Sequence, residues 1–298
     1  MSVLLGAIEA GGTKFVCVVA RDAATILAER RVATTTPAAT LGAAEDFFAT
    51  VSSEMGALSA IGIASFGPLD IRRSSPTYGH LLATPKPGWA DADLAARFAT
   101  RFACPVVLDT DVNAAALAEA LHGAARGCGV VVYVTVGTGI GGGIVVRGRA
   151  VHGALHPEMG HIRVLRHERD RERSGVCAFH DDCIEGLASG GAIRARYGAP
   201  LDRLPAGHEA PEIVGYYLGQ LAATIVLMIS PERIVFGGGV MNNDRVLPEL
   251  RSAAARLLNG YLPFAKWPRS LDELIVAPGL GERSGIVGAI TLAEAARI

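Results

Sequence analysis

Two cysteines flank a histidine in the stretch "GVCAFHDDC", and we call residues 177–183 the Cys/His segment. Cys177, His180 and Cys183 follow one another at intervals of three positions, and thiolate sulfur and imidazole nitrogen are donors that zinc prefers in proteins. His161 lies upstream, across a polar stretch, and would complete a tetrahedral set of ligands. Three interpretations are open at this point: a zinc site, a disulfide bond, or a solvated loop whose thiols are incidental.

The cysteine count and the charge balance narrow these interpretations. The 298 residues include five cysteines, an odd number, and no positively charged region precedes the first apolar run, which favours a first strand over an export signal. This combination suits a reducing cytoplasm, where disulfides are rare. The net charge is −1 with no basic run, and no stretch reaches the roughly 20 consecutive apolar residues of a membrane helix. The sequence therefore predicts a cytoplasmic protein that binds neither nucleic acid nor a membrane.

Carboxylate and amide side chains gather where a predicted strand meets a predicted helix, in "LDTDVNAAALAE". An Asp at such a junction commonly caps the helix. Asp111 could equally accept a proton from a substrate hydroxyl, with Asn113 orienting that hydroxyl. "HPEMGH" adds Glu158 and His161, and "CIEG" adds Glu185. Together these side chains suit a ligand with several neighbouring hydroxyl groups.

Two glycine-rich turns, "AGGT" and "GTGIGG", each connect two short β-rich runs. The second turn matches the dinucleotide fingerprint G-x-G-x-x-G, but a β pattern follows it where that motif requires a helix. The first is not a Walker loop, because Gly12 stands where that motif needs Lys. Both are either ordinary tight hairpins or phosphate-binding turns, in which Thr13 and Thr138 would add hydroxyl donors. A third glycine run, Gly237–Gly239, follows a predicted strand, where open α/β domains bind ligands.

The hydrophobic pattern supplies two similar sets of elements to position these residues. In the first set, we predict strands at 3–9, 14–20, 58–65 and 104–110, and helices at 41–55, 90–103 and 111–126. In the second set, we predict strands at 129–136, 142–148, 233–239 and 271–279, and helices at 184–197, 210–229, 244–260 and 282–298. In each set a glycine turn connects the first two strands into a hairpin.

Two consecutive sets of this kind predict two α/β domains of similar plan, with a ligand in the cleft between them. A chain of 298 residues, half of them hydrophobic, is long enough for two cores. We assign 1–118 to an N-terminal domain with the first hairpin and Asp111. We assign 119–298 to a C-terminal domain with the second hairpin, the Cys/His segment and the later glycine run. The last helix is expected to pack back on the N-terminal domain.

Six motifs resemble, in the same order, those of the ROK family of bacterial sugar kinases, and the resemblance covers essentially the whole chain. They are "GGTK", "TDVNAAALAE", "VGTGIGGGIV", "PEMGH", the Cys/His segment and "VFGGGVM". The resemblance implies an actin/hexokinase-like (ribonuclease H-like) α/β fold. Within the family the chain is most similar to the zinc-containing fructokinase branch. That similarity rests on "TPKPGW", "DTDVN", "GVCAFHDDCIEGLASG" and "IEAGGTK", in which Glu9 stands where glucokinases usually carry Asp.

The resemblance also implies roles for individual residues. Asp111 would be the general base on the 6-hydroxyl of a hexose. The other sugar hydroxyls would be bound by Gly67, Asn113, Glu158, His161 and Glu185. ATP, with Mg²⁺ bridging its phosphates, would be bound by Gly11, Gly12, Thr13, Lys14, Thr138, Gly139, Gly237, Gly238, Gly239, Val240 and Met241. A structural Zn²⁺ would be held by His161, Cys177, His180 and Cys183, as a clip that sets the sugar-binding side chains in place.

The resemblance therefore implies ATP-dependent transfer of a phosphoryl group to O6 of a hexose, with D-fructose as the first choice. The alternatives are glucose, mannose or an N-acetylhexosamine as the sugar, and a sugar-binding regulator without catalysis. Regulators of the family carry a helix-turn-helix ahead of the first strand, for which a strand that begins at residue 3 leaves no room. Relatives are commonly dimers, so a homodimer is expected.

Overall fold

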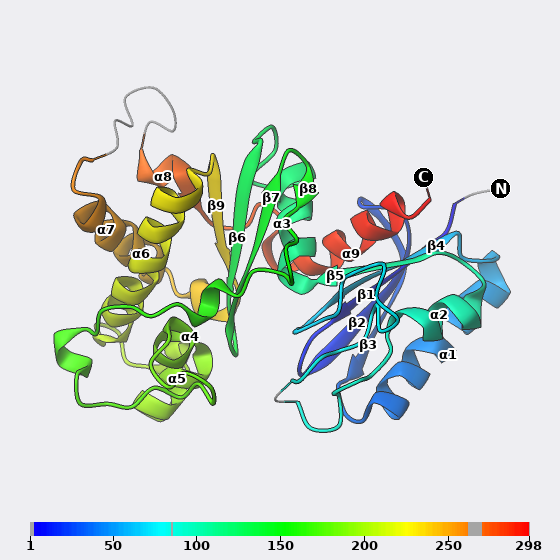
Figure 1. Cartoon of the computed structure of the whole chain (residues 1–298), viewed down its shortest axis with the longest axis horizontal. Helices are drawn as coiled ribbons and strands as arrows, with labels where there is room; N and C mark the ends of the chain where they lie inside the picture. Colours follow the sequence, from blue (N-terminus) through cyan, green and yellow to red (C-terminus); the bar gives the residue numbers. More distant parts are fainter. Residues whose placement is uncertain (1–2, 85, 262–269, 298) are drawn as a thin grey trace. The chain divides into compact units, whose positions relative to one another are not determined.

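The computed structural model describes residues 3–84, 86–261 and 270–297 (Figure 1). The chain divides into two compact units. Unit 1 comprises Met1–Ala118, Ala150–His156 and Arg283–Ile298. Unit 2 comprises Glu119–Arg149 and Pro157–Glu282. Each unit is built on its own five-stranded sheet.

The sheet of unit 1 has the strand order β3-β2-β1-β4-β5. Its strands are β1 (Leu5–Ala10), β2 (Lys14–Asp22), β3 (Thr25–Ala33), β4 (Ala60–Ser65) and β5 (Val106–Thr110). β1 and β2 form the predicted antiparallel hairpin, and β4 and β5 run parallel to β1, as βα crossovers require. β3 was not predicted. It is an edge strand whose residues are mostly exposed or half-buried, so it lacks the apolar alternation that marks a strand.

The helices of unit 1 are α1 (Pro37–Met55), α2 (Ala95–Phe102), the start of α3 (Asp111–Leu121), and α9 (Ser284–Ala295). α1 begins four residues before its predicted start, because Thr36 caps it and a proline occupies its first position. α2 is shorter than predicted: Asp91, just before it, has a positive φ of 63° that a helix cannot continue through. α9 packs on β1 and β4. Gly62 of β4 allows that approach, since a Cβ there would lie 1.9 Å from the carbonyl oxygen of Ala289.

The sheet of unit 2 has the strand order β10-β9-β6-β7-β8. Its strands are β6 (Val130–Val136), β7 (Ile140–Val146), β8 (Arg149–Ala150), β9 (Arg233–Gly237) and β10 (Ile275–Val276). β6 and β7 form the second predicted hairpin, and β9 runs parallel to β6. The strand predicted at 271–279 is wrong over most of its length. Ser270 caps a single helical turn, α8 (Leu271–Leu274), and only β10 remains as strand.

The helices of unit 2 are α4 (Ile184–Ala188), α5 (Gly190–Tyr197), α6 (Ala210–Ile229) and α7 (Val246–Leu258). The single helix predicted at 184–197 is interrupted at Ser189, which is extended and caps α5 through the N–H of Ala192. Short 3₁₀ turns lie at Met159–His161, Glu168–Asp170, Leu201–Arg203, Gly239–Asn242 and Gly281–Arg283.

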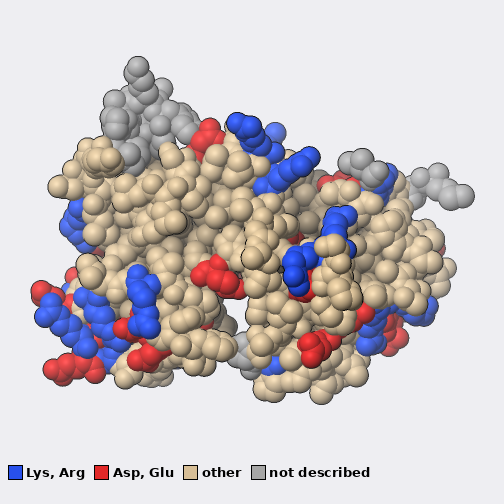
Figure 2. Space-filling model, viewed as in Figure 1, with Lys and Arg blue, Asp and Glu red and all other residues tan. Residues whose placement is uncertain are grey.

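α6 is the central helix of unit 2. By length and composition it could cross a membrane, but 67% of its most apolar window is buried inside the fold, where it packs on α7 and α4. It is therefore a core helix, hydrophobic nearly all round because other elements surround it. On the face drawn in Figure 2, positively and negatively charged side chains are interspersed rather than separated.

Candidate functional site

Three predicted site residues of unit 1 follow the ends of three parallel strands. Gly11 follows β1, Gly67 lies two residues beyond β4, and Asp111 follows β5. β4 is hydrogen-bonded to both β1 and β5, and the last residues of the three strands are paired in register. The structure therefore brings these residues to one edge of the sheet, the carboxyl edge at which open α/β sheets bind ligands.

Asp111, the predicted general base, is the first residue of α3 and is half-buried. Its Oδ1 accepts a hydrogen bond from the N–H of Val112 at 2.9 Å. The N–H of Asn113, which follows Val112, donates to the hydroxyl of Thr110 at 3.2 Å. Because Thr110 supplies the hydrogen bond that an N-cap residue normally makes, the helix does not need Asp111 as its cap.

Asn113 is fully buried, and its environment differs from the one predicted. Its Nδ2 donates to Oδ1 of Asp109 at 2.7 Å, and its Oδ1 has no partner among the residues the structure describes. In this structure Asn113 thus faces Asp109. The contact with sugar that the resemblance implies stays a prediction.

Asp109 was not predicted as a site residue; it is a buried carboxylate that follows three apolar residues in β5. Nε2 of His152 donates to its Oδ2 at 2.7 Å, and this ion pair raises the pKa of His152 above its usual value. The histidine side chain is 40% exposed. The one signal in the sequence was the position of Asp109 itself, since a charged residue inside an apolar strand needs a partner.

Gly67 lies against a second histidine that was not predicted. A Cβ on Gly67 would lie 3.2 Å from Cε1 of His156, closer than side chains normally come. His156 is buried, and its Nε2 accepts a hydrogen bond from the N–H of Leu69 at 3.1 Å. The imidazole thus fixes the chain just after Gly67.

The turn of the β1–β2 hairpin contains Gly11, Gly12 and Thr13, with Lys14 at the start of β2. The N–H of Gly11 donates to the carbonyl of Lys14 at 3.0 Å and closes the turn. The ammonium group of Lys86, from the "TPKPGW" motif, donates to the carbonyl of Gly12 at 2.6 Å. Lys86 is a further residue that the sequence did not predict, and it holds the turn from outside.

Glu9 lies in the last part of β1, near this turn. Burial raises the pKa of its carboxyl, although Lys14 and Arg31 act in the opposite direction. A Cβ on Gly285, at the start of α9, would lie 2.5 Å from Oε1 of Glu9. Gly285 therefore makes room for the longer carboxylate that stands at this position.

In unit 2 the predicted nucleotide residues also lie at one sheet edge. β6 and β9 are parallel, with Thr135 paired to Gly237, so the turn with Thr138 and the run Gly237–Met241 begin side by side. Gly238 has a φ of 93°, and a Cβ there would lie 2.6 Å from backbone atoms of Val136. The structure thus brings together Thr138, Gly139 and the residues 237–241.

Two predicted sugar-binding carboxylates lie near this second turn. Oε2 of Glu185 accepts from the N–H of Ile140 at 2.9 Å, and a Cβ on Gly139 would lie 2.5 Å from the same oxygen. The pKa of Glu158 is raised, first by burial and then by the negative charge of Glu185. The two carboxylates are therefore close enough for their negative charges to repel each other. This proximity is compatible with both of them binding the same ligand.

The four predicted zinc ligands come together in unit 2. One donor atom from each of His161, Cys177, His180 and Cys183 lies within 4.8 Å of all the others. Nδ1 of His161 is 3.5 Å from Sγ of Cys183 and 3.7 Å from Sγ of Cys177, whose sulfur is 3.6 Å from Nδ1 of His180. Both cysteines are free thiols in the structure. Two sulfur and two nitrogen donors converging in this way fit Zn²⁺.

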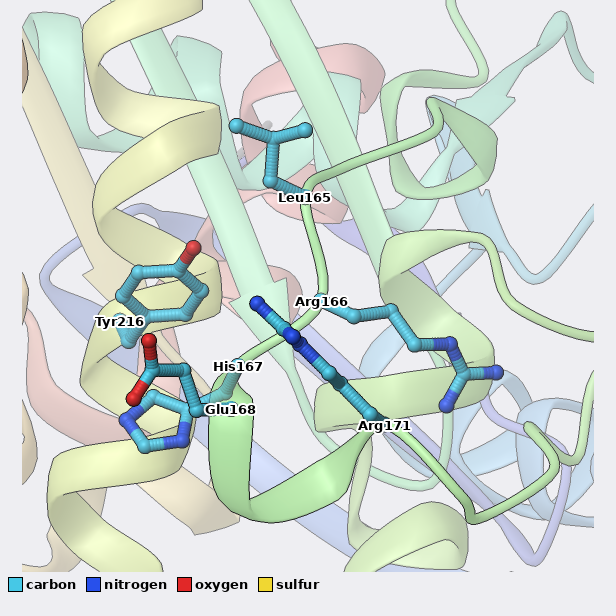
Figure 3. A pocket seen from close by; sticks show the side chains of 6 residues that line it. All are labelled: Leu165, Arg166, His167, Glu168, Arg171 and Tyr216. Carbon is cyan, nitrogen blue, oxygen red and sulfur yellow. The ribbon is translucent and has the colours of Figure 1, made fainter.

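The polar stretch between His161 and the Cys/His segment is partly buried and makes hydrogen bonds to the rest of unit 2. Asp170 is buried, and its Oδ2 accepts from Arg196 at 2.7 Å and from the hydroxyl of Tyr217 at 2.6 Å. Beside it lies a pocket of about 580 Å³. Its lining residues, none of them a predicted site residue, are Leu165, Arg166, His167, Glu168, Arg171 and Tyr216 (Figure 3).

The family model of the ROK family matches residues 5–296, so the chain belongs to the ROK family. The fructokinase of Zymomonas mobilis is 47% identical over 296 residues, covering 98% of this chain and 97% of that protein. The putative fructokinase of Bacillus subtilis is 43% identical over 293 residues, covering 98% and 96%. A glucokinase of Streptomyces coelicolor is 29% identical over 323 residues, covering 96% of each.

Solved structures of relatives show the same fold. The ROK hexokinase from Thermus thermophilus matches with a TM-score of 0.77 at 28% identity, covering 98% of each chain. A ROK family glucokinase from Streptomyces griseus, solved in complex with glucose and AMPPNP, matches with a TM-score of 0.72 at 26% identity, covering 98% and 99%. The predicted actin/hexokinase-like α/β fold is confirmed.

Proposed function

We propose that the chain transfers the γ-phosphoryl group of ATP to O6 of a hexose, with D-fructose as its main substrate. Its identity to the fructokinases is well above its identity to the glucokinase, over nearly the full length of each. The structural observation that carries the proposal is the placement of Asp111 and Gly67 at one sheet edge, beside the glycine turn of the first hairpin. The residues proposed as the base, as part of the sugar-binding turn and as the phosphate-binding turn therefore follow neighbouring strands.

In the proposed reaction, Asp111 accepts the proton of the 6-hydroxyl as the oxygen attacks the γ-phosphorus and the bond to the β-phosphate oxygen breaks. The products are the hexose 6-phosphate and ADP. As the family resemblance implies, the other hydroxyls would be bound by Gly67, Asn113, Glu158, His161 and Glu185. Most of the rate enhancement in such a transfer comes from alignment and charge stabilisation rather than covalent chemistry.

The nucleotide would be bound by the two glycine turns and the later glycine run. Gly11–Lys14, Thr138, Gly139 and Gly237–Met241, the residues that the resemblance implies, carry backbone N–H groups, hydroxyls and one ammonium group suited to phosphate oxygens. Mg²⁺, when bound, offsets phosphate charge. Glu9, a buried carboxylate near the first turn, is the residue we propose to hold the ion or its waters.

We propose Zn²⁺ as the occupant of the cluster of His161, Cys177, His180 and Cys183. Glu158 lies three residues before the first of these, and Glu185 two residues after the last. Metal ligation would therefore hold both sugar-binding carboxylates through their own short segments. His161 could bind the metal through one ring nitrogen and face the sugar with the other.

A first domain boundary between residues 118 and 119, a homodimeric assembly and a cytoplasmic location complete the proposal. A non-catalytic sugar-binding regulator is the second candidate. The two candidates separate on product analysis: incubation with ATP, Mg²⁺ and fructose, followed by ³¹P NMR, should show fructose 6-phosphate and ADP. Sugar binding without any phosphorylated product would favour the regulator.

A further inference from the structure

Asp109 is a buried charged group that the mechanism above does not use. It is 3% exposed, and both of its carboxylate oxygens accept hydrogen bonds. Oδ1 accepts from Nδ2 of Asn113 and from the N–H of Thr110, each at 2.7 Å, and Oδ2 accepts from Nε2 of His152 at 2.7 Å. Because a buried carboxylate without partners is costly, these bonds fix its orientation tightly.

Two of these bonds come from residues close to Asp111 in the sequence: Thr110, directly before it, and Asn113, two positions after it. In addition, the N–H of Asn113 donates to the hydroxyl of Thr110. We call residues 109–113 the β5–α3 junction. Side-chain hydrogen bonds thus connect the residues of the junction to one another, and His152 adds a side-chain bond from a distant part of the chain.

His152 lies in the segment 150–156, which belongs to unit 1 although the chain on both sides of it belongs to unit 2. Apart from Ala150 in β8, the segment has no helix or strand. Two imidazoles hold it in unit 1: His152 on Asp109, and His156 on the N–H of Leu69. Its two ends therefore contact the two predicted sugar-binding parts of the unit, the β5–α3 junction and the turn after Gly67.

We propose that His152 is a positioning residue: through Asp109 it fixes the β5–α3 junction and with it the carboxylate of Asp111. This inference rests on the proposed function, since it assigns His152 to the reaction in which Asp111 is the base. The geometry requires a hydrogen on Nε2, because a carboxylate only accepts. The charge-assisted bond at 2.7 Å is of the strong kind, so its loss should displace the junction measurably.

Two substitutions that differ by one methylene test the assignment. In His152→Gln, the amide nitrogen can occupy the position of Nε2 and still donate to Asp109. In His152→Asn, the shorter amide reaches only the position of Nδ1, so the bond to Asp109 is lost. Both variants are neutral, polar and smaller than histidine, so general effects on packing are similar.

The assignment predicts a clear split between the two variants. His152→Asn should lower kcat about tenfold to hundredfold, as a displaced catalytic group does, with the KM for ATP unchanged. In His152→Gln, kcat should stay within about threefold of the wild-type value, because the hydrogen bond to Asp109 is retained. Asp109→Asn combined with His152→Asn should lose no more than the more severe single variant, because both act through one contact.

A matched control is available in the same unit. Nε2 of His80 lies 4.0 Å from Oδ2 of Asp93, a second half-exposed His–Asp pair, and neither residue is assigned to the site. His80→Asn should leave kcat unchanged. Thermal unfolding of every variant then separates a loss of kcat from a loss of folded protein.

Three results would overturn the assignment. One is a His152→Asn variant with wild-type kcat. Another is the reverse order, with His152→Asn active and His152→Gln impaired, which would place the important contact at Nδ1. The third is additive losses in the double variant. If the wild type itself phosphorylates no hexose, the proposed function fails instead, and the role of His152 in that reaction fails with it.

Discussion

The β5–α3 junction of unit 1 and the Cys/His segment of unit 2 hold their functional side chains in different ways. At the junction, Asp109 accepts hydrogen bonds from His152, 43 residues away, and from Thr110 and Asn113, which lie close to Asp111 in the sequence. In unit 2, four soft donors from a span of 23 residues, 161–183, converge on one point. The first arrangement is sensitive to charge and side-chain length, and the second to metal and thiol chemistry.

The difference also separates two kinds of functional role. In the proposed reaction the junction positions the group that accepts the proton, so damage there should appear in kcat. The Cys/His cluster is proposed to position carboxylates that bind hydroxyls, so damage there should appear first in the KM for the sugar. Substitutions in one region should therefore not reproduce the effect of substitutions in the other.

The largest effect is expected from Asp111→Asn. The amide keeps the shape of the side chain but cannot accept the proton of the 6-hydroxyl, so kcat should fall by about 10²–10⁴. Binding of fructose, measured by calorimetry without ATP, should remain close to that of the wild type. Rapid phosphorylation by this variant would refute the role of Asp111 as the base.

Removal of the metal should produce the second largest effect. Cys177→Ser, or treatment of the wild type with a strong chelator, should raise the KM for fructose about tenfold to hundredfold, because Glu158 and Glu185 lose their support. Zinc content, measured by atomic absorption, should fall in parallel. Cys128→Ser changes a half-buried thiol of the same unit outside the cluster and serves as the control. An unchanged KM in a zinc-free protein would contradict the proposed clip.

A smaller effect is expected from Lys86→Met at the first glycine turn. The substitution removes the bonds from Nζ to the carbonyls of Gly12 and Thr34, at 2.6 and 3.2 Å. The KM for ATP should rise about threefold to tenfold, because the net contribution of such hydrogen bonds is about 1 kcal/mol, with the KM for fructose unchanged. Lys86→Arg keeps a charged donor and should recover most of the affinity. Equal effects on both substrates would show that Lys86 does more than hold the turn.

The smallest effect concerns the pH dependence of stability. Asp109 raises the pKa of His152 above its unfolded value of about 6.5. The ion pair should therefore stabilise the fold fully below that pH, and the contribution should be lost as the pH rises through the folded pKa. In urea unfolding between pH 6 and 9, the advantage of the wild type over His152→Gln should shrink with increasing pH. A constant difference would mean that the charge of His152 does not contribute.

The comparison of the two regions also explains what the sequence could predict. The Cys/His cluster was predicted because three ligands lie at fixed short spacing, and the structure places His161 with them as expected. The hairpins and β4 were predicted because their apolar runs are buried and bounded by glycine or polar residues. β3 was missed because an exposed edge strand carries no such pattern.

The positioning groups were missed for a different reason. His152 and His156 lie in a segment without periodicity, and their partners, Asp109 and Leu69, are 43 and 87 residues away. The distance between two residues along the chain does not predict such a contact, because the contact depends on which strands are neighbours in the sheet. Asn113 illustrates the same limit: its position beside Asp111 suggested a ligand contact, whereas its amide faces a buried carboxylate.

The central claim is that the chain is an ATP-dependent kinase with a preference for fructose, and a coupled ADP-release assay tests it most directly. Wild type and Asp111→Asn would be assayed with ATP and Mg²⁺ on fructose, glucose, mannose and N-acetylmannosamine, with zinc measured on the same samples. The account predicts the highest kcat/KM on fructose for the wild type, near loss of turnover in the variant, and about one zinc per chain in both. Higher kcat/KM on another hexose would contradict the substrate assignment, and no turnover on any of the four would contradict the claim that the chain is a kinase.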